Sequence, residues 1–255
     1  MPPSDSPDVP SSRLASRTSR LNAAEAALIL FAKAPVPGQV KTRLCPPLTP
    51  DEAASLHGSF VLDALERSRG IANLDRFLAC APAADHVFFK IMEERQGVRL
   101  MSQVDDDLGA RMTHAMTVAF SQGYRSVLMV GTDLPTLPPA IYNQALVLLS
   151  DHDLVLGPAL DGGYYLVGLT RPLPDLFVGI PWSTDQVMAL TRRKADSLGL
   201  KTGLLPAYRD VDTIDDLRAL IDEAGVKQHL SVRTAGALRL LAERLRERQG
   251  DKPAG

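Results

Sequence analysis

Short, continuously apolar runs alternate with longer amphipathic segments along most of the chain, and this alternation limits the possible folds more than any other feature. Most runs are apolar throughout rather than at every second position, which is typical of strands covered on both faces of a sheet. Strands that alternate with helices predict an α/β fold, with a parallel sheet between helices. The expected strands are 27–32, 76–81, 98–102, 126–131, 153–159, 164–169 and 202–206.

Helix-start and helix-stop signals mark the segments between these runs. Thr49 precedes Pro50 and two acidic residues, which is the pattern of an N-cap, a first-turn proline and a favourable dipole. Gly123 is placed to follow a helix in the left-handed conformation, and Ser183 or Thr184 to begin one. The expected helices lie within segments 49–68, 107–123, 138–150, 183–199, 212–225 and 231–249.

The connection LDGG, between the apolar runs 153–159 and 164–169, is too short to contain a helix. Parallel strands need a crossover of a dozen or more residues, so we expect a hairpin or another antiparallel excursion here. No repeat or linker divides the chain, and a single domain over 27–249 is the simplest organisation. The Pro-, Ser- and Arg-rich segment 1–26 is expected to be a disordered tail, and 250–255 a C-terminal tail.

Charge and cysteine content limit the classes of partner and the compartment. The formal net charge is −2, which gives no overall attraction to nucleic acid. Cys45 and Cys80 have neither disulfide-framework nor metal-site spacing, so we expect free thiols in a cytoplasmic protein. No apolar run approaches the ~20 residues of a membrane-spanning helix. Nothing in the sequence indicates an oligomeric state.

The stretch FAKAPVPGQVKTRL, residues 31–44, directly follows the first expected strand and gathers positive charge on a stiff loop. Two prolines restrain its backbone, and Gly38 permits close approach. Lys33, Lys41 and Arg43 would lie at the carboxyl edge of the sheet, where open α/β proteins bind ligands. Lysine offers phosphate a point charge and arginine a bidentate fork. Phosphate binding is favoured, and a solvated basic loop is the alternative.

Carboxylates follow other expected strands. Asp133, in GTDLPTLPP, could hold a divalent ion, since Mg²⁺ needs only one or two carboxylates, or it could be a turn or cap residue. Asp161, in LDGGYYLVGL, could bind a sugar hydroxyl or a metal-bound water, could act as a proton acceptor, or could simply form an Asp-Gly-Gly turn. Asp210 and Asp212, in RDVDTIDDL, precede a helix. Asp212 could cap that helix or supply a second metal carboxylate.

Three further features give weaker signals. The triple Asp105–Asp107 matches the D-x-D pattern of metal-dependent sugar transferases, but it opens an expected helix and is better explained as a helix start. Trp182 could stack on a base or a sugar, or could anchor a loop. The five histidines lack metal-ligand spacing, and no serine elbow or Cys–His signature is present. Covalent nucleophilic catalysis is therefore not expected.

Six segments resemble, in order, those of the glycosyltransferase-A-like family DUF2064: FAKAPVPGQVKTRL, DLGARM, GTDLPTL, VLGPALDGGYYLVGL, IPWST and DVDTIDDL. This family is similar both to glycosyltransferases and to phospholactate guanylyltransferases. The resemblance spans about Leu28 to Leu217. It implies a Rossmann-like glycosyltransferase-A fold, whose mixed, mainly parallel sheet binds a nucleotide di- or triphosphate with Mg²⁺ or Mn²⁺. The chain departs from the family pattern at Asp106, where Gly is common, and at Leu134, where Cys is common.

The resemblance implies roles for most of the candidate residues. Lys33, Lys41 and Arg43 would bind the nucleotide phosphates, Asp133 and Asp212 would hold the metal used in catalysis, and Asp161, Gly162 and Gly163 would face the acceptor or sugar. From their chemistry and position we add Gly38 to the phosphate site and Tyr164 and Trp182 to the substrate site, and we expect Asp161 to orient or deprotonate an acceptor hydroxyl.

Three functions are compatible with these residues. The leading hypothesis is a metal-dependent glycosyltransferase that moves sugar from a nucleotide sugar to a small acceptor. The second is a nucleotidyltransferase that joins an NTP to a phosphorylated small molecule and releases pyrophosphate. The third is a nucleotide-binding protein without catalysis. The single carboxylate in GTD counts for the second, and the retained cations and carboxylates count against the third.

Overall fold

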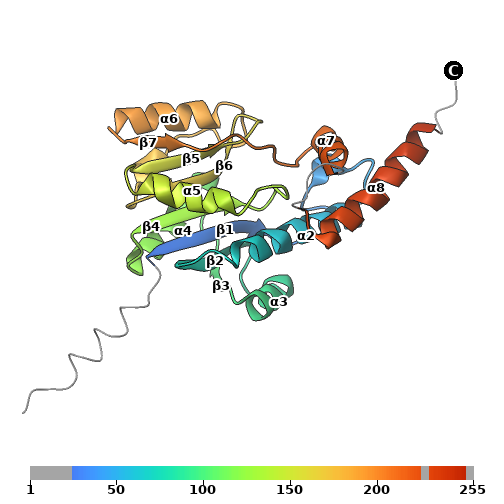
Figure 1. The fold of residues 1–255 in the computed structure, drawn as a ribbon, viewed down its shortest axis with the longest axis horizontal. Coiled ribbons are helices and arrows are strands. Elements are labelled where there is room, and N and C mark those ends of the chain that lie inside the picture. The colour runs from blue at the N-terminus through green and yellow to red at the C-terminus, as the bar shows by residue number, and fades with distance from the viewer. Residues whose placement is uncertain (1–24, 225–229, 251–255) are drawn as a thin grey trace, which may run out of the picture.

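The computed structural model describes residues 25–224 and 230–250, which form a seven-stranded sheet with flanking helices (Figure 1). The tails expected at 1–26 and 250–255 lie outside the described residues, except for residues 25, 26 and 250. The strands are β1 (Ala26–Lys33), β2 (Leu74–Ala81), β3 (Arg99–Ser102), β4 (Ser126–Gly131), β5 (Leu154–Pro158), β6 (Tyr164–Leu169) and β7 (Thr202–Leu204). They lie side by side in the order β3-β2-β1-β4-β6-β5-β7.

The sheet is mixed and mostly parallel, as expected. Among the described strands, β6 runs antiparallel to β4 and β5, and the other neighbours pair in parallel. The direct pairing of β5 with β6 confirms the hairpin expected at LDGG. All the expected strands are present, and β4 and β6 have the expected bounds.

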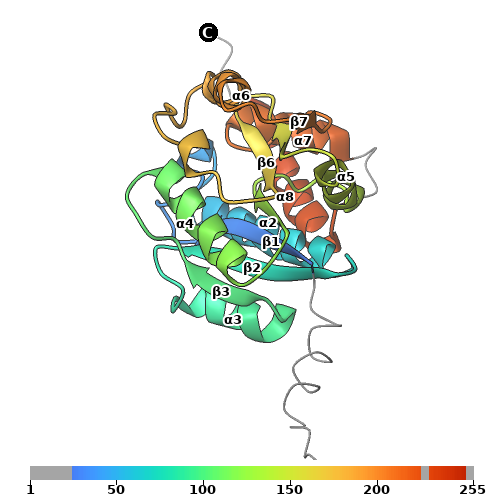
Figure 2. The same cartoon turned by 90° about the vertical axis from the view of Figure 1, so that its left-hand side faces the viewer.

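Helices cover both faces of the sheet (Figure 2). One face packs against α2 (Pro50–Ser68), α3 (Val87–Gln96) and α5 (Ala140–Leu149), and the other against α4 (Leu108–Ser121) and α6 (Val187–Ser197). Along β1, Leu28 and Leu30 belong to the first core, whereas Ala27 and Ile29 belong to the second. Successive side chains of a strand point to opposite faces, so burial on both faces explains why this run is apolar throughout.

A third hydrophobic cluster lies beyond the sheet, where α2 meets α7 (Ile214–Ala224), α8 (Val232–Gly250) and the 3-10 helix η1 (Thr42–Leu44). Asp63 of α2 is 1% exposed, and it accepts hydrogen bonds from the Arg233 guanidinium at 2.7 Å and the Thr234 hydroxyl at 2.6 Å. A buried carboxylate needs such partners. Helix α8 therefore packs on α2 and α7 of its own chain.

One helix and one helix start differ from the sequence expectation. Helix α3 was not expected; its N-cap is His86, whose ring accepts from the Phe88 N–H, and histidine is not among the common N-cap residues. Helix α6 begins after Gln186 rather than at Ser183 or Thr184. Ser183 has a φ of 64°, whereas an N-cap needs extended backbone. The capping signals at Thr49 and Gly123 are confirmed.

Within the described part of the chain, every helix is too short or too polar to cross a lipid bilayer.

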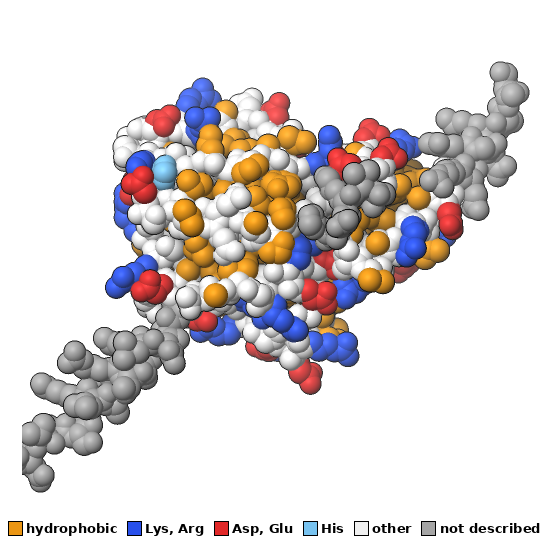
Figure 3. Space-filling view, in the orientation of Figure 1, with side chains coloured by type: hydrophobic (Ala, Val, Ile, Leu, Met, Phe, Trp, Pro, Cys, Tyr) orange, Lys and Arg blue, Asp and Glu red, His pale blue; other side chains and the backbone are white. Residues whose placement is uncertain are grey.

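Hydrophobic side chains gather over α5 and the adjacent β7 on the face shown in Figure 3. Val147 of α5 is 71% exposed and Leu204 of β7 is 45% exposed. These two residues line a surface groove that is separate from the cavities described next.

Candidate functional site

The carboxyl ends of β1 and β4 lie at the same edge of the sheet as the amino end of β6, because β6 is antiparallel. Two adjoining cavities open there and share lining residues, among them Arg43, Ser183 and Asp212. The polar lobe, about 450 Å³, is rich in charged lining residues: Lys33, Lys41, Arg43, Asp106, Arg111, Asp133 and Asp212. The aromatic lobe, about 490 Å³, is lined by a hydrophobic wall that includes Phe31, Leu108, Met112, Met129, Tyr164, Tyr165, Val167 and Trp182.

Lys41 lies between the two carboxylates that were expected to hold a metal. Its Nζ is 2.8 Å from Asp133 Oδ1 and 2.8 Å from Asp212 Oδ1, and it donates to the Val211 carbonyl at 2.6 Å. The Lys41 side chain is only 3% exposed. Burial by itself would lower the lysine pKa, but Asp133 and Asp212 outweigh burial and raise it. The Lys41 ammonium therefore donates hydrogen bonds to Asp212 and to the Val211 carbonyl and forms an ion pair with Asp133.

The backbone of the first loop places Lys41 in this position. Gly38 has a φ of 76°, which glycine adopts readily. Lys41 itself has a φ of 49° and a ψ of 35°, in the left-handed region that lysine seldom occupies. The chain then enters η1, whose Leu44 is fully buried in the third cluster. Strained conformations of this kind concentrate at functional sites.

Asp133 is the most constrained carboxylate of the site. Its Oδ1 lies 3.4 Å from Nδ1 of His57, a buried residue of α2 whose Nε2 contacts the Lys33 carbonyl at 3.0 Å. Burial would raise the pKa of Asp133, but Lys41 and His57 together hold it well below its usual range. The Val211 N–H donates to the Asp133 carbonyl at 3.0 Å and ties together the loops that carry the two carboxylates.

Asp212 does not cap α7, contrary to one of the two expectations. Thr213 does so: its N–H donates to Asp216 at 2.9 Å, and the Asp216 N–H donates back to the Thr213 hydroxyl at 3.3 Å. This reciprocal pattern is a capping box, here closed by Asp in place of Glu. The Asp212 side chain is 44% exposed and contacts Lys41, so it takes no part in capping the helix.

Asp161 and Asp210 extend the acidic side of the site. Burial first, and then the nearby charges of Asp161 and Asp212, raise the pKa of Asp210 to about 6. Asp161 lines the aromatic lobe, and its Oδ1 accepts from the Gly163 N–H at 2.9 Å. Asp161 therefore forms the turn considered in the sequence and also faces a cavity. A Cβ on Gly162, which has a φ of 91°, would lie 2.2 Å from the Asp185 carbonyl, so only glycine fits.

Lys33 and Arg43 are the two cations of the polar lobe that remain available to a ligand. Both side chains are exposed, and within the described residues neither forms an ion pair or a side-chain hydrogen bond. Arg111, by contrast, donates to the carbonyls of Asp105 and Asp106. Asp107 accepts from the Gly109 N–H at 2.7 Å and is the N-cap of α4, which confirms the helix-start interpretation of the triple Asp.

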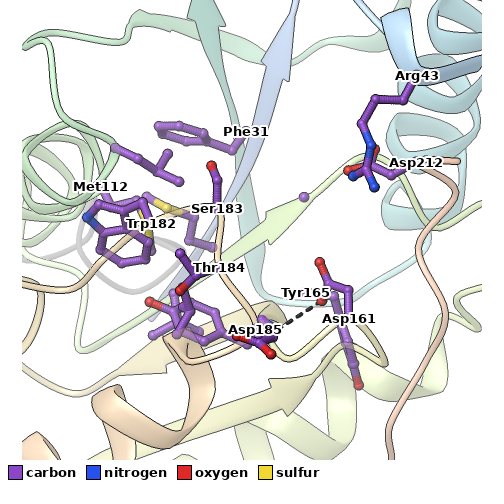
Figure 4. Close-up of a pocket in the computed structure, with 17 residues that line it drawn as sticks. Phe31, Arg43, Met112, Asp161, Tyr165, Trp182, Ser183, Thr184, Asp185 and Asp212 are labelled. Carbon is purple, nitrogen blue, oxygen red and sulfur yellow. Dashed lines mark hydrogen bonds between the residues drawn. The ribbon is translucent and has the colours of Figure 1, made fainter.

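The aromatic lobe has a rigid wall built around Trp182. Its ring meets Tyr164 edge to face, with centroids 6.3 Å apart and an interplanar angle of 83°. A Cβ on Gly109 would lie 2.8 Å from the Trp182 ring, so glycine is required for this packing. Figure 4 shows Phe31, Met112 and Trp182 on one side of the cavity, and Arg43, Asp161 and Asp212 on the other.

Several lining residues were not expected from the sequence. His57 and Met112 come from the middle of α2 and α4, and Asp185 comes from the turn before α6. Met112 closes the segment DLGARM, but no catalytic or binding signal distinguishes it, and no local motif contains His57 or Asp185. His57 and Met112 have the pattern of ordinary positions on amphipathic helices, and only the packing of those helices brings them to the site.

Asp133 and Asp212 fit a divalent ion that brings other ligands with it. Within residues 25–224 and 230–250 no group of three or more His, Cys, Asp or Glu side chains is arranged to hold a metal. Mg²⁺, however, commonly takes one or two carboxylates and completes its shell with water and phosphate. The two carboxylates already converge on one cationic group, Lys41, so their geometry and chemistry suit a cation.

Comparison with known proteins identifies the family and the fold. The family model described as "Uncharacterized protein conserved in bacteria (DUF2064)" matches residues 64–184. A crystal structure of a candidate nucleotide-diphospho-sugar transferase from Desulfovibrio desulfuricans is 34% identical; the match covers 88% of this chain and 98% of that one, with a TM-score of 0.81. No curated protein matches the sequence.

More distant structures share the fold alone. The CMP-2-keto-3-deoxy-manno-octonic acid synthetase complexed with CTP is 13% identical, with a TM-score of 0.50 and coverage of 78% of this chain and 98% of that one. The bifunctional IspDF of Campylobacter jejuni is 10% identical, with a TM-score of 0.51 and coverage of 76% and 53%. The chain therefore belongs to the DUF2064 family, and it is a transferase with the fold of the nucleotide-diphospho-sugar transferases.

Proposed function

We propose that the protein is a metal-dependent glycosyltransferase that takes a nucleotide sugar as donor and a small molecule as acceptor. The observation that carries this proposal is the polar lobe, where the unpartnered cations Lys33 and Arg43 line the same cavity as the carboxylate pair Asp133 and Asp212. The relative from Desulfovibrio desulfuricans, a candidate transferase of nucleotide-diphospho sugars, supports the choice of donor.

The polar lobe would bind the diphosphate of the donor. Lys33 and Arg43 contribute a point charge and a bidentate fork, and Gly38 leaves room for the phosphates. Asp133 and Asp212 would hold Mg²⁺ or Mn²⁺, which when bound stabilises the negative charge of the departing nucleoside diphosphate. The lobe thus presents preorganised positive charge where negative charge develops.

The acceptor would enter from the aromatic lobe, with Trp182, Tyr164 and the Gly162–Gly163 turn around it. Asp161 takes the proton of the acceptor hydroxyl, whose oxygen forms a bond to the anomeric carbon of the sugar. The bond from that carbon to the diphosphate oxygen breaks, and the nucleoside diphosphate leaves with the electron pair. This displacement needs no covalent enzyme nucleophile.

A nucleotidyltransferase is the second candidate, and one observation favours it. The two metal carboxylates come from separate loops, after β4 and after β7, rather than from one D-x-D motif. The synthetase that shares the fold was solved with CTP, a bare triphosphate. In that reaction, the same cations and carboxylates would serve an in-line displacement at the α-phosphorus with pyrophosphate as the leaving group.

Thermal unfolding with a panel of nucleotides tests the proposal. NTPs, nucleoside diphosphates and nucleotide sugars are each added with and without Mg²⁺ or Mn²⁺. A ligand at about a hundred times its Kd stabilises by roughly 2.7 kcal/mol, which is easily measured. The proposal predicts a metal-dependent preference for one nucleotide sugar. A preference for a bare triphosphate would favour nucleotidyl transfer, and no metal-dependent shift would contradict both catalytic functions.

Two variants make this panel specific. Asp133→Asn removes a metal carboxylate and should lose the metal-dependent shift. Asp196→Asn is the matched control, because Asp196 is an exposed carboxylate on α6 whose side chain has no partner among the described residues. The control should shift as the unmodified protein does.

A further inference from the structure

We infer that the acceptor is a hydroxyl-bearing molecule with an apolar face and without a phosphate group. This inference rests on the proposed function, because it concerns the second substrate of the same site. It follows from the different charges of the two lobes and from the construction of the aromatic wall.

The aromatic lobe is placed to hold the molecule that reacts with the bound donor. It adjoins the polar lobe and shares Arg43, Ser183 and Asp212 with it. A donor whose diphosphate lies against Lys33 and Arg43 would direct its reacting end toward these shared residues. A molecule in the aromatic lobe is therefore the one that meets it.

The charges in the aromatic lobe oppose a phosphate. Three carboxylates line it, Asp161, Asp185 and Asp212, against the single cation Arg43, which it shares with the polar lobe. The other cations of the site, Lys33, Lys41 and Arg111, line the polar lobe and not the aromatic lobe. Like charges only a few ångströms apart in a partly desolvated site repel strongly. A phosphate ester would lie among carboxylates without a cation of its own.

The opposite wall of the aromatic lobe suits an apolar face. Phe31, Met112 and Trp182 lie together on one side of the cavity (Figure 4). Trp182 is held by Tyr164 at 6.3 Å and by contact with Gly109, so its ring is already in place before a ligand binds. A large rigid aromatic surface favours the C–H face of a sugar or an alkyl or aryl group. The carboxylates across the cavity would accept hydrogen bonds from hydroxyls.

This division also separates the two candidate reactions. A nucleotidyltransferase that joins an NTP to a phosphorylated molecule needs a second phosphate site beside the first. The aromatic lobe offers hydrophobic contacts and hydrogen-bond acceptors at that position instead. The structure therefore assigns the site an unphosphorylated acceptor alcohol.

The fluorescence of Trp182 tests the inference directly, because the chain contains one tryptophan and that residue lines the aromatic lobe. The probes are phenyl β-glucoside and phenyl β-glucoside 6-phosphate, which differ only by the phosphate. Each is titrated against the full-length protein without nucleotide or metal. We expect saturable quenching by the glucoside, and a Kd for the phosphate at least roughly ten times higher.

A double variant identifies the cause of the preference. Asp161→Asn with Asp185→Asn keeps the side-chain shapes and removes two charges, so the difference between the probes should shrink several-fold; Asp196→Asn should leave it unchanged. Equal or tighter binding of the phosphate, or no response of Trp182 to either probe, would overturn the inference. Neither result depends on nucleotide or metal, so failure here is distinct from failure of the nucleotide panel.

Discussion

The polar and aromatic lobes share one edge of the sheet but are built in opposite ways. The polar lobe is made of loops held together by an ion-pair cluster, in which Lys41 contacts Asp133, Asp212 and the Val211 carbonyl. The aromatic lobe is made of rings packed on helices, with Trp182 held against Gly109 and Tyr164. The polar lobe is therefore held in shape by ion pairs, and the aromatic lobe by close packing of side chains.

This difference has a consequence for ligand binding. A metal that enters the polar lobe must replace contacts that already exist, because Asp133 and Asp212 both pair with Lys41. A molecule entering the aromatic lobe meets a wall that is already formed, so it loses little to reorganisation. Substitutions should therefore separate the lobes: those in the polar lobe should change metal and nucleotide binding, and those in the aromatic lobe should change acceptor binding.

The largest effect is expected for Asp133→Asn. Loss of a carboxylate that we propose holds the metal should lower turnover at least about 100-fold, in line with the loss of other preorganised electrostatic groups. Breaking a buried ion pair costs about 3–5 kcal/mol, but the Asp133 side chain is 35% exposed and Asp212 still pairs with Lys41, so we expect about 1–2 kcal/mol. Steady-state kinetics and urea unfolding measure the two quantities. Undiminished turnover would refute the site assignment.

Lys41→Met sharpens the account of the polar lobe. The substitution keeps an unbranched apolar stem and removes the ammonium, which leaves two carboxylates facing each other without a cation. Without metal, the protein should be about 2–3 kcal/mol less stable. Because the Lys41 ammonium no longer competes for the two carboxylates, Mn²⁺ should bind the variant roughly ten times more tightly than it binds the unmodified protein, the equivalent of about 1.4 kcal/mol. Electron paramagnetic resonance of free Mn²⁺ gives the affinity, and an unchanged value would show that Lys41 and metal do not compete.

Gly109→Ala addresses the aromatic lobe. The new Cβ would lie 2.8 Å from the Trp182 ring and 2.9 Å from the Phe177 carbonyl, so the ring must move. One misplaced methyl-sized group in a substrate pocket costs about 1–3 kcal/mol of binding free energy, so we expect phenyl β-glucoside to bind roughly tenfold more weakly. Nucleotide-dependent thermal shifts should be unaffected. A parallel loss of nucleotide binding would mean that the lobes are not independent.

Asp210→Asn is expected to have the smallest effect, seen in the pH dependence of stability. Burial, then Asp161 and Asp212, raise the pKa of Asp210 to about 6. The folded protein thus binds this proton more tightly than the unfolded chain, so the stabilisation is complete below the ordinary carboxyl pKa of about 4 and is lost as pH rises through 6. In the variant, the fall in the free energy of unfolding between pH 4 and pH 7 should be about 1 kcal/mol smaller than in the unmodified protein. Urea unfolding at several pH values measures this, and the same dependence of the unfolding free energy on pH in both proteins would show that Asp210 is not involved.

Most of the sheet could be predicted from the sequence because its central strands are buried on both faces and therefore form apolar runs; β4 and β6 have the expected bounds. The meeting of Asp133 with Asp212 follows from the same rule, since loops at one edge of an α/β sheet converge. The β5–β6 hairpin was predictable because a short connection excludes a crossover helix.

The detailed chemistry of the site was not predictable in this way. The place of Lys41 between two carboxylates depends on its left-handed backbone, which no local preference of lysine indicates. His57 reaches Asp133 only because α2 packs across the end of β1. At α6, Thr184 has a good capping side chain, but the left-handed Ser183 displaces the helix start to Gln186. Each of these depends on tertiary packing rather than on residue type.

A crystal structure with Mn²⁺ and the nucleoside diphosphate that gives the largest thermal shift would test the central claim most directly. The anomalous signal of Mn²⁺ identifies the metal without reference to activity. The account predicts Mn²⁺ bound by Asp133 and Asp212, the diphosphate against Lys33 and Arg43, and the aromatic lobe left open for an acceptor. Mn²⁺ at other residues, or the nucleotide base and phosphates within the aromatic lobe, would contradict it.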